Sequence, residues 1–159
     1  MNQENKMERL SQWLRERGVT PEVVVMEQHT ATAEAAAKAL GCELGQIAKS
    51  LVFRNKIGDY AMIVAAGDVQ LDNQKVKRLL GGRSRMANAE ELLEMTGYGP
   101  GEVCPFALRQ SLPVWLDHSL CRYEQVYTGA GSDHALLTVS YAMMLDLAGG
   151  QPGHFTIEG

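Results

Sequence analysis

A lysine within an apolar segment is the first residue of this chain whose position could serve chemistry. Residues 47–53 read Ile-Ala-Lys-Ser-Leu-Val-Phe, a composition that predicts a β-strand. Side chains alternate along a strand, so Lys49 shares its face with the apolar residues Ile47 and Leu51. Burying an ammonium group without a partner is costly. Lys49 is therefore either an edge-strand lysine that extends to solvent or a charge held in place for function.

Two glycine-rich loops could offer backbone N–H groups to a ligand. Residues 97–106 contain three glycines and two prolines, which excludes a regular helix or strand. Residues 128–133 read Thr-Gly-Ala-Gly-Ser-Asp. Glycine allows the backbone to approach a ligand closely, and exposed N–H groups can bind an anionic or polarised group. A lysine charge with two such loops suits stabilisation of a developing oxyanion better than covalent catalysis.

Metal, cofactor and thiol chemistry have weaker signals. The histidines are scattered and no Cys-x-x-Cys, Walker or Gly-x-Ser-x-Gly motif occurs, so we expect no metal and no cofactor. Cys104, on the first glycine-rich loop, is a candidate nucleophile with His118 or His134 as base. The alternative is an unreactive buried cysteine, which is the commoner role of a lone cysteine.

Helices and strands along one domain, residues 1–159, would position these groups. We expect helices over residues 7–17, from Thr30 or Thr32 to 40, over 72–80, from Asn88 to 96 and from Ser140 to the glycines at 149–150. Glu91, three residues after Asn88, predicts a capping box for the fourth of these helices. We expect strands over residues 23–26, 47–53, 60–66, 114–117, 124–127 and 135–139. The second and third of these strands predict a hairpin, and the tail from residue 151 shows no evident structure.

The composition predicts a globular protein of the cytoplasm. Apolar residues make up 45% of the chain and charged residues 21%, and no apolar run is long enough to cross a membrane. The polar start of the sequence does not resemble a signal peptide. The three cysteines, far apart and odd in number, are typical of reduced thiols.

One basic segment stands out against an acidic chain. The net charge is −4, yet five basic residues and no acidic residue lie between positions 75 and 85. This basic patch comprises Lys75, Lys77, Arg78, Arg83 and Arg85. Such a patch is compatible with a nucleic acid that docks at one place. The helix over residues 72–80 is expected to direct Lys75, Lys77 and Arg78 to solvent, and the alternative role of the patch is only a solvated helix face.

In this order, the motifs resemble the YbaK/ProX family of aminoacyl-tRNA deacylases, which are free-standing relatives of the editing domain of bacterial prolyl-tRNA synthetases. The resemblance extends over residues 23–147. It rests on Thr30-Ala31-Thr32 with the alanine-rich helix that follows, on the lysine strand, on the Gly-x-x-x-Pro loop of residues 101–106 and on the glycines near position 130.

The resemblance implies a mixed α/β (α+β) fold whose strands form a barrel-like sheet surrounded by helices. It also implies metal-independent hydrolysis of the ester that links a mischarged amino acid to tRNA, most often tRNA(Pro), by water with help from a ribose hydroxyl. It assigns catalytic roles to Lys49 and Gly101. The implied substrate-binding residues are Thr30, Ser50, Cys104, Pro105, Phe106, Gly129 and Gly131. The basic patch would bind tRNA. The expected partners are aminoacyl-tRNA and prolyl-tRNA synthetase or another synthetase, with no membrane and no DNA.

Two departures from one alanine-specific branch leave the amino acid open. Ser50 follows the lysine where that branch has asparagine, and residues 133–135 read Asp-His-Ala where it has a His-Pro pair. Alanine, serine, threonine, cysteine and 2-aminobutyrate all remain candidates. The alternative function is a non-catalytic tRNA- or synthetase-binding module of the same fold. Retention of Lys49 and Gly101 favours the enzyme.

Overall fold

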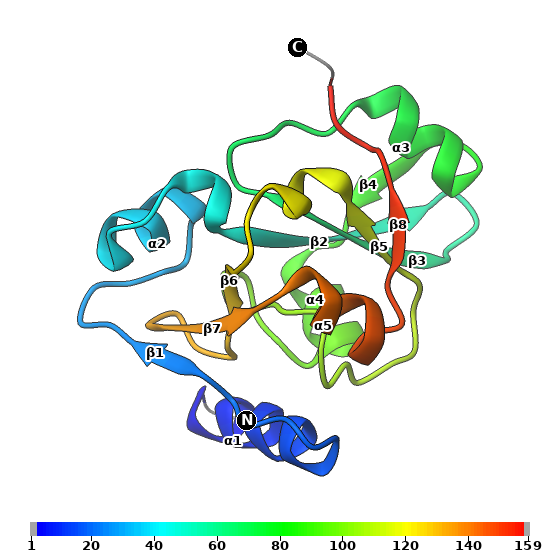
Figure 1. The fold of residues 1–159 in the computed structure, drawn as a ribbon. Helices are drawn as coiled ribbons and strands as arrows, with labels where there is room; N and C mark the ends of the chain where they lie inside the picture. Colours follow the sequence, from blue (N-terminus) through cyan, green and yellow to red (C-terminus); the bar gives the residue numbers. More distant parts are fainter. Residues whose placement is uncertain (1–2, 158–159) are drawn as a thin grey trace.

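The computed structural model describes residues 3–157 as two β-sheets with helices packed around them (Figure 1). The five-stranded sheet has the order β4 (Ser84–Met86), β2 (Ala48–Asn55), β3 (Tyr60–Ala66), β5 (Val114–Asp117) and β8 (Gln151–Gly153). The three-stranded sheet has the order β1 (Val23–Val25), β7 (Ala135–Val139) and β6 (Val126–Gly129). The helices are α1 (Gln3–Glu16), α2 (Ala33–Leu40), α3 (Asn73–Leu80), α4 (Ala89–Thr96) and α5 (Tyr141–Leu147), with short 3-10 turns η1 (Leu44–Gln46) and η2 (His118–Arg122).

The predicted hairpin is confirmed and carries the lysine strand. Strands β2 and β3 pair antiparallel, with Lys49 opposite Ala65 and Ser50 opposite Val64. Strand β5 runs parallel to β3, and β8 runs parallel to β5. Strand β3 is buried along almost its whole length, because it has a neighbouring strand on each side and core residues on its faces.

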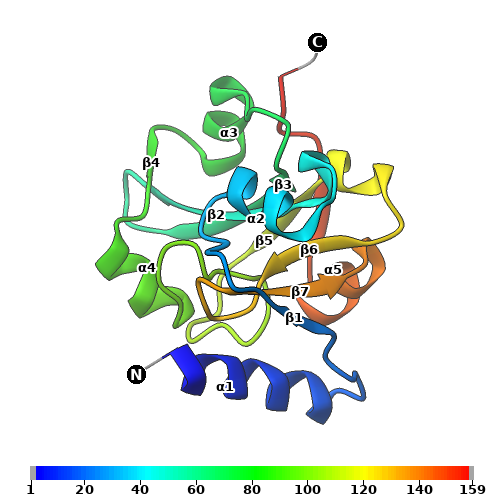
Figure 2. The same ribbon diagram turned by 90° about the vertical axis from the view of Figure 1, so that its left-hand side faces the viewer.

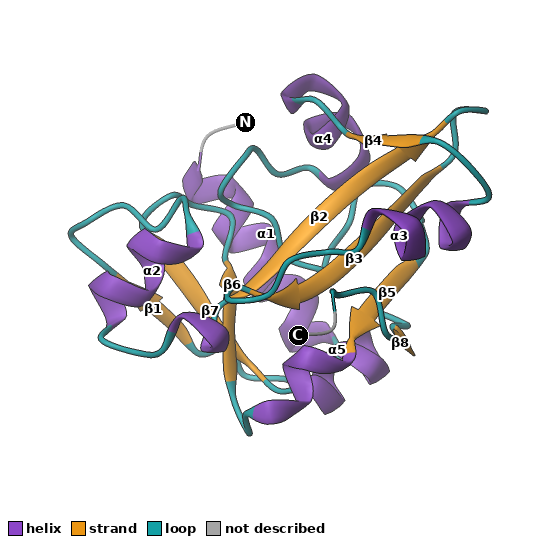
Figure 3. Cartoon of the chain, turned by 90° about the horizontal axis from the view of Figure 1, so that it is seen from above, coloured by secondary structure: helices purple, strands orange, loops and turns teal. Residues whose placement is uncertain are grey.

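The predicted barrel-like closure is wrong, whereas the mixed α/β class is confirmed. The described strands form two open sheets, each with two edge strands, as the view in Figure 3 makes clear. An isolated bridge between Ile47 and Tyr127 links the start of β2 to β6. Strands β1, β4 and β8 are only three residues long, too short to continue the hydrogen bonding around a closed cylinder.

Helix α1 packs beneath the three-stranded sheet, at the opposite end of the molecule from α3 (Figures 1 and 2). Its apolar side inserts Leu10 and Leu14 into the main core, and Trp13 stacks on Phe106 with ring centroids 5.7 Å apart. None of the helices within residues 3–157 is long and apolar enough to cross a membrane.

Predicted capping residues begin α2, α4 and α5, whereas α1 begins at Gln3 rather than at position 7 and α5 ends at Leu147, before the predicted glycines at 149–150. Thr32, rather than Thr30, caps α2, because its hydroxyl accepts a hydrogen bond from the Ala35 N–H at 3.1 Å. The capping box of α4 is confirmed: the side chains of Asn88 and Glu91 each accept the other's backbone N–H. Left-handed glycines end α2, α3 and α4 at Gly41, Gly81 and Gly97.

Two edge strands were not predicted. Strand β4 is exposed and lacks the alternation of a half-buried strand. Strand β8 contains Pro152, which an edge strand tolerates but which hides the strand in the sequence. The tail is instead fixed by the buried Asp117, whose carboxylate accepts the N–H groups of Phe155 at 2.7 Å and Ser119 at 3.0 Å. Strand β6 also begins later than predicted, at Val126.

Candidate active site

A cavity of about 280 Å³ opens where β2, the start of α2, the β4–α4 wall and the first glycine-rich loop meet. Five of the predicted site residues line it: Thr30, Lys49, Ser50, Gly101 and Gly129. Most of the remaining wall is formed by alanine and aliphatic side chains, which is typical of a small-ligand site. A larger hollow of about 570 Å³ on the outer surface of α1 contains none of the predicted site residues.

Lys49 is half-buried on β2, and its ammonium donates a hydrogen bond to the Val69 carbonyl at 2.9 Å. A carbonyl carries no net charge, so this contact orients the ammonium without neutralising it. The neighbouring Asp68 is engaged elsewhere, with its carboxylate bound by Arg122 at 2.5 and 3.0 Å. Hydrogen bonds from Arg122, with a smaller contribution from Lys49, hold the pKa of Asp68 below its usual value. Lys49 thus lines the cavity with its ammonium held by a neutral group.

The first turn of α2 adds to this positive potential. Thr32, at the N-cap, and Ala33, at the first helical position, both line the cavity. The amino-terminal end of a helix carries a partial positive charge from its unsatisfied N–H groups. The cavity is therefore suited to a ligand on which negative charge is present or develops.

Gly101 and Gly129 bring the two glycine-rich loops into contact with their neighbours. Gly101 has φ +79°, and a Cβ there would lie 2.8 Å from the Cα of Ala31. A Cβ at Gly129 would lie 2.6 Å from the carbonyl carbon of Glu102 and the carbonyl oxygen of Val103. These positions need glycine for close approach of one backbone to another, which fixes the shape of the cavity wall.

A buried ion pair supports the first glycine-rich loop from below. The Glu102 carboxylate accepts hydrogen bonds from the Lys6 ammonium at 2.8 Å and from the Gly99 N–H at 2.7 Å. The Glu102 carbonyl accepts the N–H of Gly131, from the second loop, at 3.1 Å. Sequence reasoning missed both charged residues. Glu102 lies within the loop motif of residues 101–106, but no sequence signal distinguishes Lys6 from the other charged residues of α1.

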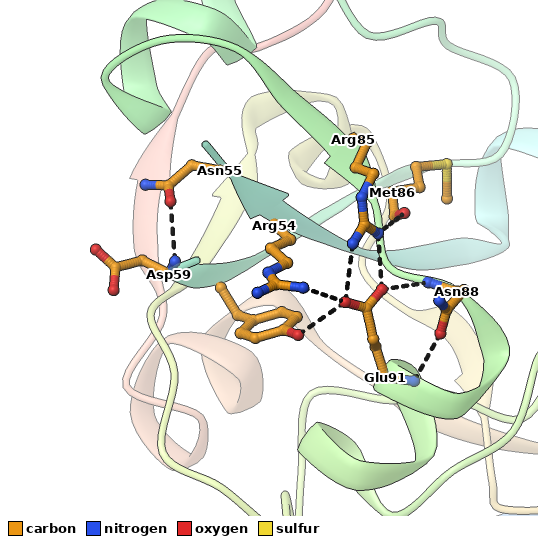
Figure 4. Close-up of polar contacts among 8 residues, drawn as sticks. Arg54, Asn55, Asp59, Arg85, Met86, Asn88 and Glu91 are labelled. Carbon is orange, nitrogen blue, oxygen red and sulfur yellow. Dashed lines mark hydrogen bonds and ion pairs between the residues drawn. The ribbon is translucent and has the colours of Figure 1, made fainter. Parts of the chain in front are cut away.

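The β4–α4 wall of the cavity is held by Glu91. The sequence indicated that this residue caps a helix, but not that it joins that helix to the strands. Its carboxylate binds Arg85 at 2.7 and 3.0 Å, Arg54 at 2.9 Å and the Tyr60 hydroxyl at 3.0 Å (Figure 4). These bonds, those from Arg85 above all, hold the pKa of Glu91 far below its usual value. The network joins β2, β3, β4 and α4, and so positions the wall that includes Leu92.

Cys104 lies in the hydrophobic core, outside the cavity lining. Its thiol is fully buried and donates to the Tyr98 hydroxyl at 3.5 Å. Burial raises the pKa of Cys104 to about 11, so the thiolate needed for attack is not formed near neutral pH. The arrangement is that of a structural cysteine.

Three other predicted substrate-binding residues also lie away from the cavity lining. Pro105 and Phe106 are buried beside Cys104, where the Phe106 ring packs against Trp13. Gly131 has φ +82°, and a Cβ there would lie 3.1 Å from backbone and side-chain atoms of Lys6. These residues support the loops from the core side and do not face the cavity.

The basic patch is divided between free and engaged side chains. Lys77, Arg78 and Arg83 are exposed. The expectation that Lys75 faces solvent is wrong: it is half-buried, and its ammonium donates to the Thr156 carbonyl at 2.9 Å. Arg85 is exposed, but its guanidinium binds Glu91 as described above. A tRNA role for the patch stays a prediction.

Within residues 3–157, no cluster of three histidine, cysteine, aspartate or glutamate side chains is arranged to hold a metal ion. The residues that line the cavity include a lysine, two threonines, a serine and two glycines. These groups can orient a small polar ligand and stabilise negative charge on it.

Comparisons with known proteins identify the family of this chain. The profile of the aminoacyl-tRNA editing domain family matches residues 27–147. The uncharacterized protein YwhH of Bacillus subtilis is 41% identical over 130 residues, which cover 82% of this chain and 80% of that protein. The multifunctional Ser/Thr-tRNA deacylase ProXp-y of Escherichia coli is 30% identical over 113 residues, 68% of each chain. A solved structure of a candidate trans-editing enzyme for prolyl-tRNA synthetase superposes with a TM-score of 0.87, at 36% identity over 96% of this chain and 98% of that one.

Proposed function

The chain belongs to the aminoacyl-tRNA editing domain family, as its motifs indicated, and from that premise we propose that it removes small, mischarged amino acids from tRNA(Pro). The reaction is hydrolysis of the ester between the amino acid and the terminal ribose. The observation that supports this proposal best is the placement of Lys49, Gly101 and Gly129 around one small cavity. Its size favours a small amino acid over a bulky one.

The cavity offers electrostatic stabilisation for ester hydrolysis. Water attacks the carbonyl carbon, the bond to the ribose oxygen breaks, and that oxygen leaves with a proton from the attacking water. Negative charge develops on the carbonyl oxygen in the transition state. A lysine ammonium has three N–H donors, and the bond from Lys49 to Val69 uses one of them. The remaining donors and the positive end of α2 would stabilise the oxyanion.

Rigid loops position the ester for this attack. Gly101 is in contact with Ala31, and Gly129 is in contact with the backbone at Glu102. A fixed geometry lowers the entropic cost of bringing water and carbonyl together. No side chain needs to form a covalent intermediate, and the buried, protonated Cys104 is consistent with attack by water.

The test is deacylation of a panel of tRNA(Pro) species charged with alanine, serine, threonine, cysteine, 2-aminobutyrate or proline. The proposal predicts release of at least one of the small amino acids and protection of prolyl-tRNA(Pro), followed as loss of radiolabel from precipitated tRNA. If the protein binds these tRNAs but releases none of the amino acids, the chain is a non-catalytic binding module. The same panel, repeated with prolyl-tRNA synthetase present, tests whether a synthetase acts as partner.

A further inference from the structure

Two residues that line the cavity carry buried hydroxyl groups without a hydrogen-bond partner among the described residues. The lining residues with polar side chains are Thr30, Thr32, Lys49 and Ser50. The Thr32 hydroxyl caps α2 and the Lys49 ammonium binds Val69. By contrast, Thr30 Oγ1 and Ser50 Oγ have no hydrogen-bond partner within residues 3–157, although both atoms are buried.

An unsatisfied buried hydroxyl is costly, so two of them in one cavity indicate a ligand that supplies the missing partners. Thr30 is only 5% exposed, and its backbone N–H is already fixed by the Asp133 carbonyl at 2.6 Å. Ser50 is fixed by the β2–β3 ladder opposite Val64. The backbone of both residues is therefore held in place at the cavity wall.

We propose that the hydroxyls of Thr30 and Ser50 form a polar subsite for the side-chain hydroxyl of the amino acid, so that the substrate carries a small β-hydroxy amino acid, serine or threonine. This inference rests on the proposed function. A hydroxyl both donates and accepts, so it can bind two other hydroxyls at once. The α-ammonium group of the substrate fits less well, because the charge of Lys49 lies in the same cavity and would repel it.

The residues around this subsite are apolar, which increases the discrimination between a hydroxyl and a methyl group on the amino acid. Ala31, Ala48 and Leu51 also line the cavity. An amino acid with a methyl group in place of the hydroxyl would leave Thr30 and Ser50 without partners. A site built to bind a hydroxyl rejects the analogue that lacks it far more strongly than an apolar pocket rejects one methylene group.

Serine and 2-aminobutyrate are the substrates that test this subsite, because they differ only by a hydroxyl against a methyl group. Single-turnover rates on tRNA(Pro) charged with each should differ by about 100-fold or more in favour of serine. Ser50→Ala and Thr30→Val should each lower the rate on the serine substrate and reduce this ratio by at least about tenfold. Thr30→Ser, which keeps the hydroxyl, should retain the ratio.

Thr128→Val is the matched control. The Thr128 hydroxyl is also buried and without a hydrogen-bond partner among the described residues, but Thr128 does not line the cavity. Its replacement should leave the ratio between the two substrates unchanged. A shift as large as that of Ser50→Ala would show that the ratio responds to any buried hydroxyl, which would overturn the proposal.

The remaining outcomes separate this proposal from the proposed function. Equal rates on the two substrates, or an equal loss on both in Ser50→Ala, would overturn the subsite while leaving the deacylase intact. If neither substrate is hydrolysed, adenosine analogues that carry serine or 2-aminobutyrate through a stable 3′-amide still test the subsite. Tighter binding of the serine analogue, measured by calorimetry and abolished in Ser50→Ala, supports it. Equal affinities overturn it.

Discussion

Lys6 on α1 and Lys49 on β2 are both largely withdrawn from solvent, but they differ in what balances their charge. The Lys6 ammonium binds the buried Glu102 carboxylate at 2.8 Å. The Lys49 ammonium binds the neutral carbonyl of Val69 at 2.9 Å. Lys6 is therefore part of a neutral pair beneath the glycine-rich loop, whereas Lys49 brings a net positive charge to the cavity.

The difference between the two lysines indicates a structural role for Lys6 and a chemical role for Lys49. A buried pair is expensive to break, since loss of one partner leaves a charge in a poorly solvated place. A lysine tethered to a carbonyl carries a desolvation cost that a purely structural residue would avoid. Removing Lys6 should therefore affect folding first, and removing Lys49 should affect activity first.

The largest effect on stability is expected from Lys6→Met. Methionine fills similar space but removes the ammonium that balances Glu102, so the free energy of unfolding should fall by about 3–5 kcal/mol. Urea denaturation measures this. The double variant Lys6→Met with Glu102→Gln, which removes both charges and keeps an acceptor for the Gly99 N–H, should recover part of the loss. Near-normal stability of Lys6→Met would contradict the structural role of the pair.

Gly101→Ala should lower the deacylation rate by about 100-fold, because a shift of the loop by about 1 Å misplaces the ester. Gly41→Ala is its control. Both glycines are left-handed, with φ +79° and +75°, but a Cβ at Gly41 meets nothing within 4 Å whereas one at Gly101 meets Ala31. Both variants should lose a similar amount of unfolding free energy, because alanine is strained at a positive φ. Only Gly101→Ala should lose activity. Full activity of Gly101→Ala would remove the loop from the site.

A smaller effect is expected from the exposed part of the basic patch. Replacing Lys77, Arg78 and Arg83 together by alanine should raise KM for aminoacyl-tRNA and leave kcat nearly unchanged. The slope of log KM against log salt should fall by about 0.7–0.9 for each tRNA phosphate that the variant no longer neutralises. Replacing the exposed Arg15 and Arg109 together by alanine is the control, because it removes positive charge outside the basic patch. An unchanged KM and salt slope in the triple variant would show that tRNA docks elsewhere.

The smallest effect is expected from Cys104→Ala. Burial raises the pKa of this thiol to about 11, so at lower pH it stays protonated and unreactive. The deacylation rate should match that of the unaltered protein, and iodoacetamide should alkylate the exposed Cys121 well before Cys104 in the folded state. Parallel loss of activity and alkylation of Cys104 would restore the thiol mechanism.

The sequence predicted those parts of the fold and site that local chemistry specifies. The capping residues Thr32 and Asn88 set helix starts, and the runs of apolar residues set β3 and β7. Lys49 was identified by its place on an apolar strand and the loop of Gly101 by its glycines, the resemblance assigned their catalytic roles, and the structure places both residues at one cavity. Their roles in catalysis stay predictions.

What the sequence did not predict depends on contacts between distant segments. Lys6 and Glu102 are 96 residues apart, and neither has a neighbour in sequence that indicates an ion pair. Strand β8 pairs with β5, and Asp117, at the end of β5, accepts the N–H of Phe155 just after β8, a contact between segments distant in sequence. Cys104 appeared reactive because it lies on a glycine-rich loop, but its side chain turns into the core.

The central claim is that Lys49 supplies charge for catalysis, and the direct measurement compares the unaltered protein with Lys49→Met. Single-turnover deacylation with enzyme in excess over seryl-tRNA(Pro), alongside urea denaturation of both proteins, gives the two quantities needed. We expect the rate to fall by about 100-fold or more in Lys49→Met, the scale of removing one oxyanion donor, with no loss of unfolding free energy. A variant that hydrolyses the substrate at nearly the original rate would contradict the account.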